Sequence, residues 1–234
     1  MSESSDDSRS RRAVLLGGGV VAAGAVGAGA LTLLGGDDTA RTAVAEAPVP
    51  PAPGEYRYAT TAADGDDRPT VTYIGSYKCP ACARFSSDFF EEVLGEYVST
   101  GEVALEFRHL AYVEGEPFLG PDAPNAGHAG LAVWNADPDS YWAFHERVMA
   151  NQPPESETWA TADRLTEFAA DAGVADPSVV REAVEQKQYE SAIRATSEAA
   201  KSAGIEGTPA LVIDGEAVTA LQKSEVRSRL DDLG

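Results

Sequence analysis

The sequence is poor in cysteine, with two among its 234 residues. Two cysteines are too few for a disulfide-stapled scaffold, and too few for a four-cysteine zinc or iron–sulfur site. No repeat with a fixed period is present. Hydrophobic residues make up 43% of the chain and charged residues 24%, close to globular averages, which excludes wholesale disorder. The length suits one large domain or two small ones, each with its own core.

Basic residues are also scarce. Lysine and arginine total 18 against 38 acidic residues, a formal net charge of −20. This balance argues against nucleic acid, because a phosphate backbone needs a basic face. The acidic residues are spread along the chain, so they repel one another unless salt screens their charges. At 1 M salt the screening length is roughly 3 Å. We interpret the pattern as adaptation to concentrated salt, as in halophiles, rather than as an ordinary acidic surface.

The N-terminal 34 residues resemble an export signal. The pair Arg11-Arg12 precedes 22 uncharged residues, Ala13 to Leu34, and resembles the twin-arginine motif. A helix of that length, at ~1.5 Å per residue, could also span a ~30 Å hydrocarbon core as a membrane anchor. Ala43-Val44-Ala45 is an acceptable cleavage site, so both a secreted and an anchored form stay open. Either form places the rest of the chain outside the cytoplasm.

Residues 35–54 are predicted to be a proline-rich linker. Four prolines fall within its last seven residues, 48–54, which favours a semi-extended spacer. The folded domain is then expected over 55–234.

The first part of that domain alternates strand and helix signals. A short edge strand is expected at Tyr56-Arg57-Tyr58, and a strand rich in β-branched and aromatic residues over 70–74. A helical pattern then opens at Cys79-Pro80-Ala81-Cys82 and continues to Tyr97. A further strand is expected over 103–107, and a loop rich in glycine and proline over 114–125.

The second part is a long helical block followed by a hairpin. Helices are expected at 126–134, 141–149, 160–170, 178–186 and 189–203, separated by Asp-Pro and Pro-Pro sequences. Strands over 210–213 and 217–219 flank the turn Asp214-Gly215, and a helix over 224–233 closes the chain. The order predicts an α/β sheet domain interrupted by a helical one.

The two cysteines carry the chemistry that the sequence predicts. As a staple the pair is poor, because the loop-entropy model gives only about 1.9 kcal/mol for a four-residue ring. As half of a zinc site it has only three candidate histidine partners, namely His109, His128 and His145, without the close second pair of a zinc module. A redox dithiol accounts for position and spacing together. The helix N-terminus favours a thiolate at Cys79, and Cys82 lies one turn on, where it can attack a mixed disulfide.

Three segments resemble DsbA-like thioredoxin-fold oxidoreductases, over about Tyr56 to Leu233. They are residues 71–85 around Cys79-Pro80-Ala81-Cys82, residues 204–215 around Thr208-Pro209, and the aromatic helix Tyr141-Trp142-Ala143-Phe144-His145. The resemblance implies an α/β thioredoxin-like fold with an all-helical subdomain inserted at about 125–204. Together with the charge and the signal, it suggests a haloarchaeal member of the group.

The resemblance also implies roles for site residues. Cys79 would be the nucleophile and Cys82 the resolving thiol, with Pro80 and Ala81 forming the active-site loop between them. Pro209 would be a cis-proline facing the dithiol, and Thr208 would offer backbone groups to an extended substrate. No cofactor beyond the Cys79–Cys82 disulfide is expected. The expected partners are cysteine-containing exported proteins and an unidentified redox partner.

Two positions depart from the family pattern. Strongly oxidising members have a histidine where this chain has Ala81, so a milder oxidant is expected. Many members carry a buried acid six residues before the first cysteine, where this chain has Tyr73. The proton acceptor for Cys82 is therefore unidentified, with water or a carboxylate such as Glu106 as candidates.

Other aromatic and histidine residues have simpler interpretations. His128 and His145 are expected to be packing or surface residues rather than ligands. The core of the helical insert is expected to contain Trp134, Trp142, Trp159 and Phe144. Two other functions stay open: a metal-binding or metallochaperone module that uses the two cysteines, and a non-catalytic thioredoxin-like binding domain.

Overall fold

The computed structural model describes residues 42–62 and 66–234. The predicted signal or anchor over 1–34 therefore lies outside the described residues, as does the beginning of the predicted linker. Within the described ranges, no helix has both the length and the apolar character needed to cross a membrane.

A five-stranded mixed sheet carries the fold, in the order β1-β3-β2-β6-β7. Strands β2 and β3 are parallel, and the other neighbours are antiparallel. The strands are β1 (Ala59–Thr60), β2 (Thr70–Gly75), β3 (Ala104–His109), β6 (Ala210–Ile213) and β7 (Glu216–Thr219). The C-terminal helix α8 (Lys223–Asp231) packs against β6 and β7. This is the predicted thioredoxin-like arrangement.

The segment after β2 is helical but not continuous. It contains α1 (Pro80–Ser86), α2 (Phe89–Val93) and one turn of π-helix, η2 (Leu94–Val98). The sequence predicted one helical pattern to Tyr97, and the structure corrects this at Asp88, whose φ of −129° and ψ of −85° are not helical. After this break the adjacent Phe89 and Phe90 are both buried, at 1% and 0% exposure. The break thus lets two consecutive aromatic side chains enter the core.

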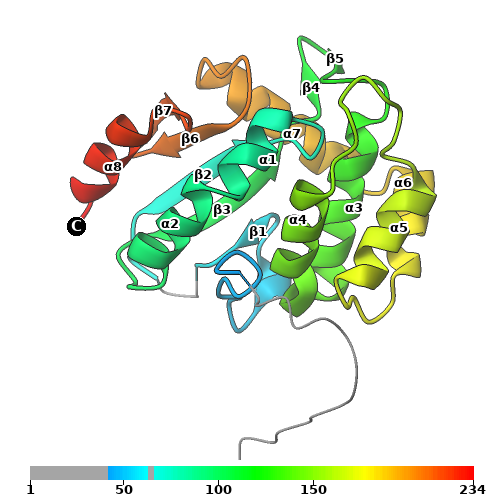
Figure 1. Cartoon of the computed structure of the whole chain (residues 1–234), viewed down its shortest axis with the longest axis horizontal. Helices are drawn as coiled ribbons and strands as arrows, with labels where there is room; N and C mark the ends of the chain where they lie inside the picture. The colour runs from blue at the N-terminus through cyan, green and yellow to red at the C-terminus, as the bar shows by residue number, and fades with distance from the viewer. Residues whose placement is uncertain (1–41, 63–65) are drawn as a thin grey trace, which may run out of the picture. The chain divides into compact units, whose positions relative to one another are not determined.

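The helical insertion follows the prediction closely. Figure 1 shows α3 to α6 gathered beside the sheet, with α1 and α2 lying in front of β2 and β3 and running in nearly the same direction. The insertion contains α3 (Ala123–Ala136), η3 (Pro138–Ser140), α4 (Tyr141–Ala150), α5 (Ala162–Asp171), α6 (Ser178–Gln186) and α7 (Glu190–Ser202). Helix α3 approaches the sheet domain closely because it has small residues there: a Cβ on Gly127 would lie 2.9 Å from the His109 ring.

Two short β elements differ from the prediction. The edge strand forms at Ala59–Thr60, directly after the expected Tyr56–Tyr58, because Ala59 and Thr60 pair with β3. The expected loop over 114–125 contains part of a hairpin made of β4 (Tyr112–Val113) and β5 (Glu116–Pro117). Its turn residues Glu114 and Gly115 both have positive φ, the geometry of the turns that join tight hairpins.

The described part of the predicted linker is not a free spacer. Val44 is 2% exposed and belongs to the main hydrophobic core, and the Trp142 indole donates a hydrogen bond to the Pro48 carbonyl at 3.3 Å. A 3₁₀ turn, η1 (Pro53–Glu55), follows. The apolar side chains of this segment give it surface to bury against the domain, so residues 42–54 pack as part of it. Cleavage after Ala45 would remove Val44 from the core.

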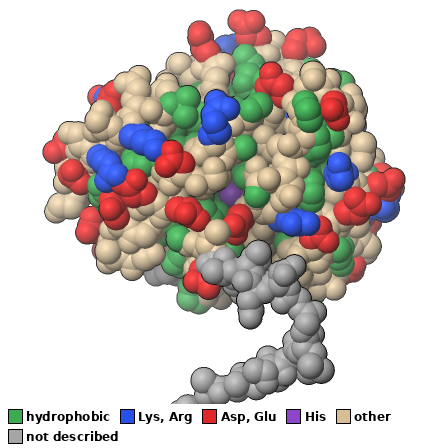
Figure 2. Space-filling view, in the orientation of Figure 1, with side chains coloured by type: hydrophobic (Ala, Val, Ile, Leu, Met, Phe, Trp, Pro, Cys, Tyr) green, Lys and Arg blue, Asp and Glu red, His purple; other side chains and the backbone are tan. Residues whose placement is uncertain are grey.

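Charged side chains are scattered over the visible face of the protein. Figure 2 shows acidic residues distributed across this face, with lysine and arginine interspersed among them. Several form exposed ion pairs, such as Arg181 with Asp163 and Arg147 with Asp171. Exposed pairs of this kind contribute roughly 0–1 kcal/mol each, so they do not remove the repulsion of a net charge of −20.

A candidate dithiol site at the start of helix α1

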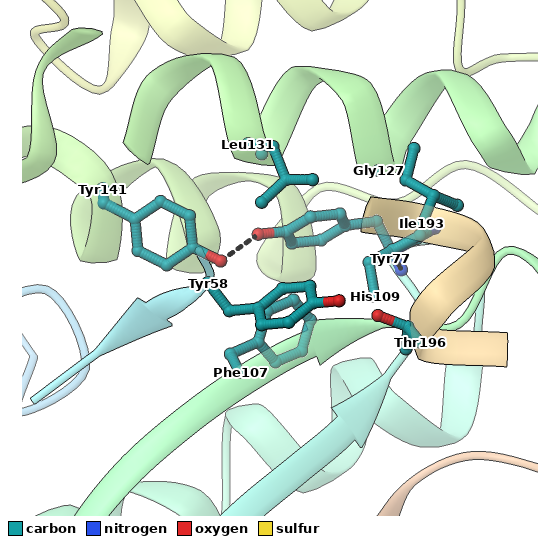
Figure 3. Close-up of a pocket in the computed structure, with 10 residues that line it drawn as sticks. Tyr58, Tyr77, Phe107, His109, Gly127, Leu131, Tyr141, Ile193 and Thr196 are labelled. Carbon is teal, nitrogen blue, oxygen red and sulfur yellow. Dashed lines mark hydrogen bonds between the residues drawn. The ribbon is translucent and has the colours of Figure 1, made fainter. Parts of the chain in front are cut away.

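One small cavity beside the sheet cannot hold a ligand. A cavity of about 10 Å³ lies between the sheet and the insertion, bordered by tyrosine, histidine and aliphatic side chains (Figure 3). This volume is just enough for about one water molecule. The hydroxyls of Tyr77 and Tyr141 meet at its edge, 3.2 Å apart. This cavity is therefore a packing feature of the core.

Both cysteines lie where β2 leads into α1. Cys79 is the N-cap of α1, its sulfur accepts a hydrogen bond from the Cys82 N–H at 3.3 Å, and Pro80 occupies the first helical position, where a missing N–H is harmless. The Ser76 N–H points at the Cys82 sulfur at 3.5 Å. Cys79 is 5% exposed and Cys82 is 0% exposed, so the first sulfur is the more accessible one.

The surroundings give the two thiols opposite acidities. Hydrogen bonds from the Cys82 thiol, from Thr208 and from the backbone N–H groups of Cys82 and Ala81 lower the pKa of Cys79 to about 6, although burial opposes the shift. Burial, and then the neighbouring Cys79 anion, raise the pKa of Cys82 well above its ordinary value. At neutral pH the site therefore holds a thiolate at Cys79 and a thiol at Cys82.

The second predicted motif lies beside the first sulfur. The Thr208–Pro209 peptide bond is cis, as the resemblance implied. When protonated, the Cys79 thiol donates to the Thr208 carbonyl oxygen, which lies 3.4 Å from the sulfur. Strand β6 begins at Ala210 and pairs with β2, which ends just before the dithiol loop. Sheet pairing thus brings together residues that are 129 positions apart.

Sequence reasoning missed a buried ion pair next to the dithiol. The Lys78 ammonium lies 2.5 Å from a carboxylate oxygen of Asp122, and their side chains are 1% and 3% exposed. The ammonium also donates to the Glu157 carbonyl at 2.9 Å. The other oxygen of Asp122 accepts from the Ala160 N–H at 2.8 Å. The pair ties the active-site loop to the insertion, and the only signal for it in the sequence was a rare lysine beside Cys79.

Gly120 makes room for this pair. A Cβ at Gly120 would lie 2.9 Å from the Lys78 ammonium, and its φ of +116° is one that other residues rarely adopt. The Gly120 backbone can therefore lie close to the Lys78 ammonium, where a side chain would collide with it.

The histidines and tryptophans behave as predicted. His128 and His145 are fully buried packing residues, and Trp134, Trp142, Trp159 and Phe144 are 5% exposed or less. Burial lowers the pKa of His145 to about 3 and that of His109 to about 4, so both rings are neutral. Among the residues that the structure describes, no group of three or more histidine, cysteine or acidic side chains could hold a metal ion.

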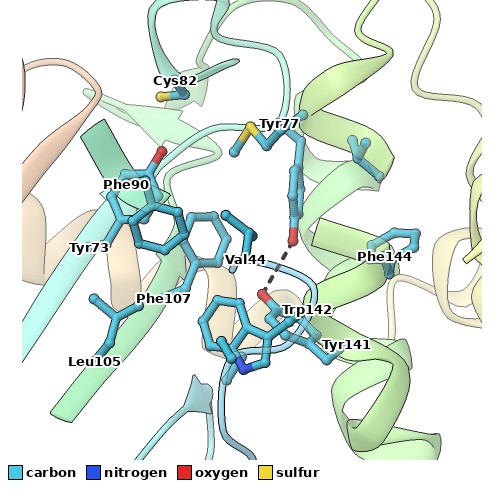
Figure 4. Close-up of a cluster of buried hydrophobic side chains, with 14 of the residues drawn as sticks. Val44, Tyr73, Tyr77, Cys82, Phe90, Leu105, Phe107, Tyr141, Trp142 and Phe144 are labelled. Carbon is cyan, nitrogen blue, oxygen red and sulfur yellow. Dashed lines mark hydrogen bonds between the residues drawn. The ribbon is translucent and has the colours of Figure 1, made fainter. Parts of the chain in front are cut away.

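Tyr73, which replaces the family's buried acid, and Glu106, the candidate proton acceptor for Cys82, lie on opposite faces of the sheet. Tyr73 is fully buried and reaches from β2 toward Cys82 (Figure 4). Glu106 alternates along β3 with Phe107, which contacts Tyr73, so the Glu106 side chain lies on the opposite face of the sheet. Its carboxylate pairs with Arg108 at 2.6 Å. The structure therefore does not support Glu106 as the proton acceptor for Cys82.

Known proteins match the chain over its folded part. The thioredoxin family profile matches residues 65–232. Disulfide bond formation protein D of Bacillus subtilis is 29% identical over 154 residues, which are 65% of this chain and 67% of that protein. A probable disulfide bond formation protein D of Bacillus cereus is 28% identical over 163 residues, 68% of this chain and 73% of its own length.

Solved structures give the same result. Oxidised BdbD from Bacillus subtilis superposes with a TM-score of 0.67 at 25% identity, covering 80% of this chain and 96% of that one. DsbA from Chlamydia trachomatis superposes with a TM-score of 0.63 at 19% identity, covering 75% and 91%, and supports the fold alone. With a dithiol at a helix N-terminus and a family profile that spans most of its length, this chain belongs to the thioredoxin family and is a thiol–disulfide oxidoreductase.

Proposed function

We propose that this protein forms disulfide bonds in exported proteins, using the Cys79–Cys82 pair as its oxidant. The observation that carries the proposal is the difference in acidity between the two sulfurs, with the pKa of Cys79 lowered to about 6. A stabilised Cys79 thiolate favours the reduced protein, and therefore makes the disulfide a better oxidant. The names of the Bacillus relatives, disulfide bond formation proteins, support the same direction.

The reaction needs two exchange steps. A substrate thiolate attacks the Cys79 sulfur, a new S–S bond forms, and the Cys79–Cys82 bond breaks with its electron pair left on Cys82. A second substrate thiolate then attacks the substrate sulfur of this mixed disulfide, and Cys79 leaves as a thiolate. Two electrons have passed from the substrate to the dithiol. An unidentified redox partner reoxidises the pair, and no cofactor beyond the dithiol enters the scheme.

Thr208 and Pro209 are the proposed substrate contacts. The Thr208 carbonyl lies beside the Cys79 sulfur, and Pro209 has no N–H to pair with a neighbouring strand. An extended substrate segment could therefore lie against Thr208 with its cysteine facing Cys79.

Oxidative refolding of a reduced, disulfide-containing protein tests this function. We expect the oxidised protein to accelerate disulfide formation, and its reduction potential to be less negative than about −200 mV, as for oxidising members of this chemistry. Because Ala81 stands where the strongest oxidants have histidine, we expect this reduction potential to be more negative than their value of about −120 mV. Stoichiometric zinc or copper after reducing purification, without exchange activity, would instead support a metal-binding module. Substrate binding without any exchange would support a non-catalytic domain.

Export is proposed to use the twin-arginine route. Arg11-Arg12 and the uncharged segment after them are the supporting features. Changing the pair to Lys-Lys keeps the charge but removes the guanidinium groups, so we expect precursor to accumulate in the cytoplasm. Fractionation of cells followed by immunoblotting measures this. Unchanged export of the Lys-Lys variant would contradict the proposal and favour insertion by the general route.

Adaptation to high salt is proposed from the charge. With a net charge of −20, self-repulsion is weakest where salt screens it, so we expect the free energy of unfolding to rise between dilute buffer and molar salt. Denaturant unfolding at several sodium chloride concentrations measures the change. Equal stability across that range would show that the acidic surface is not a salt adaptation.

A further inference from the structure

Two buried hydroxyl groups lack a hydrogen-bond partner of normal geometry in the described part of the chain, and both lie beside the dithiol. They are the hydroxyls of Tyr73 and Thr208. A buried, unpaired hydroxyl destabilises a fold by roughly 1–3 kcal/mol, so folded proteins keep few of them. The Thr208 hydroxyl makes only weak contacts with the two sulfurs, which lower the pKa values of both Cys79 and Cys82. Tyr73 lies on the inner side, toward Cys82.

The Tyr73 hydroxyl is directed at the second sulfur. In Figure 4 it rises from the aromatic cluster and points toward Cys82. It makes no hydrogen bond of normal geometry, yet Cys82 is close enough that its charge and a weak hydrogen bond raise the pKa of Tyr73, after the larger effect of burial. A weak hydrogen bond with the Ser86 hydroxyl, on the same helix as Cys82, opposes this shift. Gly75 provides the space, because a Cβ there would lie 2.9 Å from the Tyr73 oxygen.

The tyrosine is held rigidly in this position. Its ring is 0% exposed and packs against Phe85, Phe90 and Phe107, with ring centroids 5.0–5.2 Å apart. A hydroxyl fixed in an apolar cluster is preorganised, so it stabilises a charge that appears beside it without first having to reorient. The charge that appears here is the Cys82 anion, formed whenever the Cys79–Cys82 bond breaks.

We propose that the Tyr73 hydroxyl donates a hydrogen bond to the Cys82 thiolate during disulfide exchange. The inference rests on the proposed exchange at this dithiol. As an incoming thiolate bonds to Cys79, the electron pair of the breaking S–S bond moves to Cys82, where Tyr73 stabilises it. Tyr73 keeps its proton, consistent with a hydroxyl that burial makes a weaker acid. In the reverse step the same hydrogen bond increases the thiolate fraction of Cys82 before it attacks.

Tyr73→Phe tests the proposal because it removes only the hydroxyl. We expect a small thiol, dithiothreitol, to reduce the Cys79–Cys82 disulfide of this variant about tenfold more slowly, since a hydrogen bond to a charged group contributes roughly 1.5–3 kcal/mol. The pH profile of Cys79 alkylation should keep its midpoint near 6, because the hydroxyl acts on the other sulfur. Stability should be unchanged or higher, because an unpaired hydroxyl has been removed.

Tyr141→Phe is the matched control. Tyr141 is also buried in this aromatic region, but its hydroxyl meets Tyr77. We expect its reduction rate to stay within twofold of the unmodified protein. An unchanged rate in Tyr73→Phe, or equal slowing in both variants, would overturn the proposal. The dithiothreitol assay uses no protein substrate, so it tests the Tyr73 hydrogen bond separately from the proposed function. If the unmodified protein fails in oxidative refolding while Tyr73→Phe still slows reduction, only the proposed function is refuted.

Discussion

Changing Cys82 to serine is expected to trap the protein on its substrates. Cys79 can still attack a substrate disulfide as a thiolate, but no neighbouring thiol remains to release the mixed disulfide. Reductant-sensitive covalent complexes should therefore accumulate on non-reducing gels. Removing the Cys82 thiol also removes the largest cause of the low Cys79 pKa, so attack should be slower at pH 6 and largely preserved at pH 8.

The Cys79→Ser variant is the control for these complexes. It keeps the buried Cys82, which is 0% exposed and whose pKa burial raises well above its ordinary value. We expect it to form no complexes and to lose exchange activity entirely. Equal trapping by both variants, or faster alkylation of Cys82 than of Cys79 in the unmodified protein at neutral pH, would show that the two roles are assigned wrongly.

Changing Lys78 to methionine is expected to give the largest loss of stability. The variant leaves the Asp122 carboxylate buried without its cation, and breaking a buried pair in this way lowers the free energy of unfolding by about 3–5 kcal/mol. Asp122→Asn in the same chain should recover part of the loss, because an amide oxygen can still accept from the Ala160 N–H. Denaturant unfolding of the single and double variants measures the coupling.

An exposed ion pair of the same length provides the comparison. Arg181 and Asp163 also lie 2.5 Å apart, but their side chains are 43% and 77% exposed. We expect Arg181→Met to change stability by less than about 1 kcal/mol. If Lys78→Met has an equally small effect, or if the Lys78 and Asp122 substitutions are simply additive, the buried pair does not hold the insertion to the active-site loop.

The alternation of elements could be predicted because local pattern controls it. Strand β2 alternates buried and partly exposed residues before its buried end, and α6 repeats its apolar residues at helical spacing, so both were located from sequence. Boundaries that depend on pairing or packing could not be found in the same way. The edge strand forms where Ala59 pairs with β3. The segment around Val44 packs because Val44 is buried among core residues that come from distant parts of the chain.

The reactive pair could be identified from the amino-acid sequence alone, since two cysteines one helical turn apart, directly after a strand, suit a redox dithiol better than a staple or a metal site. Thr208-Pro209 was also identifiable, through resemblance. The surroundings of the sulfurs, in contrast, depend on the folded chain. Lys78 meets a carboxylate 44 positions away, and Tyr73 turns an unpaired hydroxyl toward Cys82. Such contacts join distant parts of the chain in a buried setting, where hydrogen bonds and charges have their largest effect, and no local sequence pattern records them.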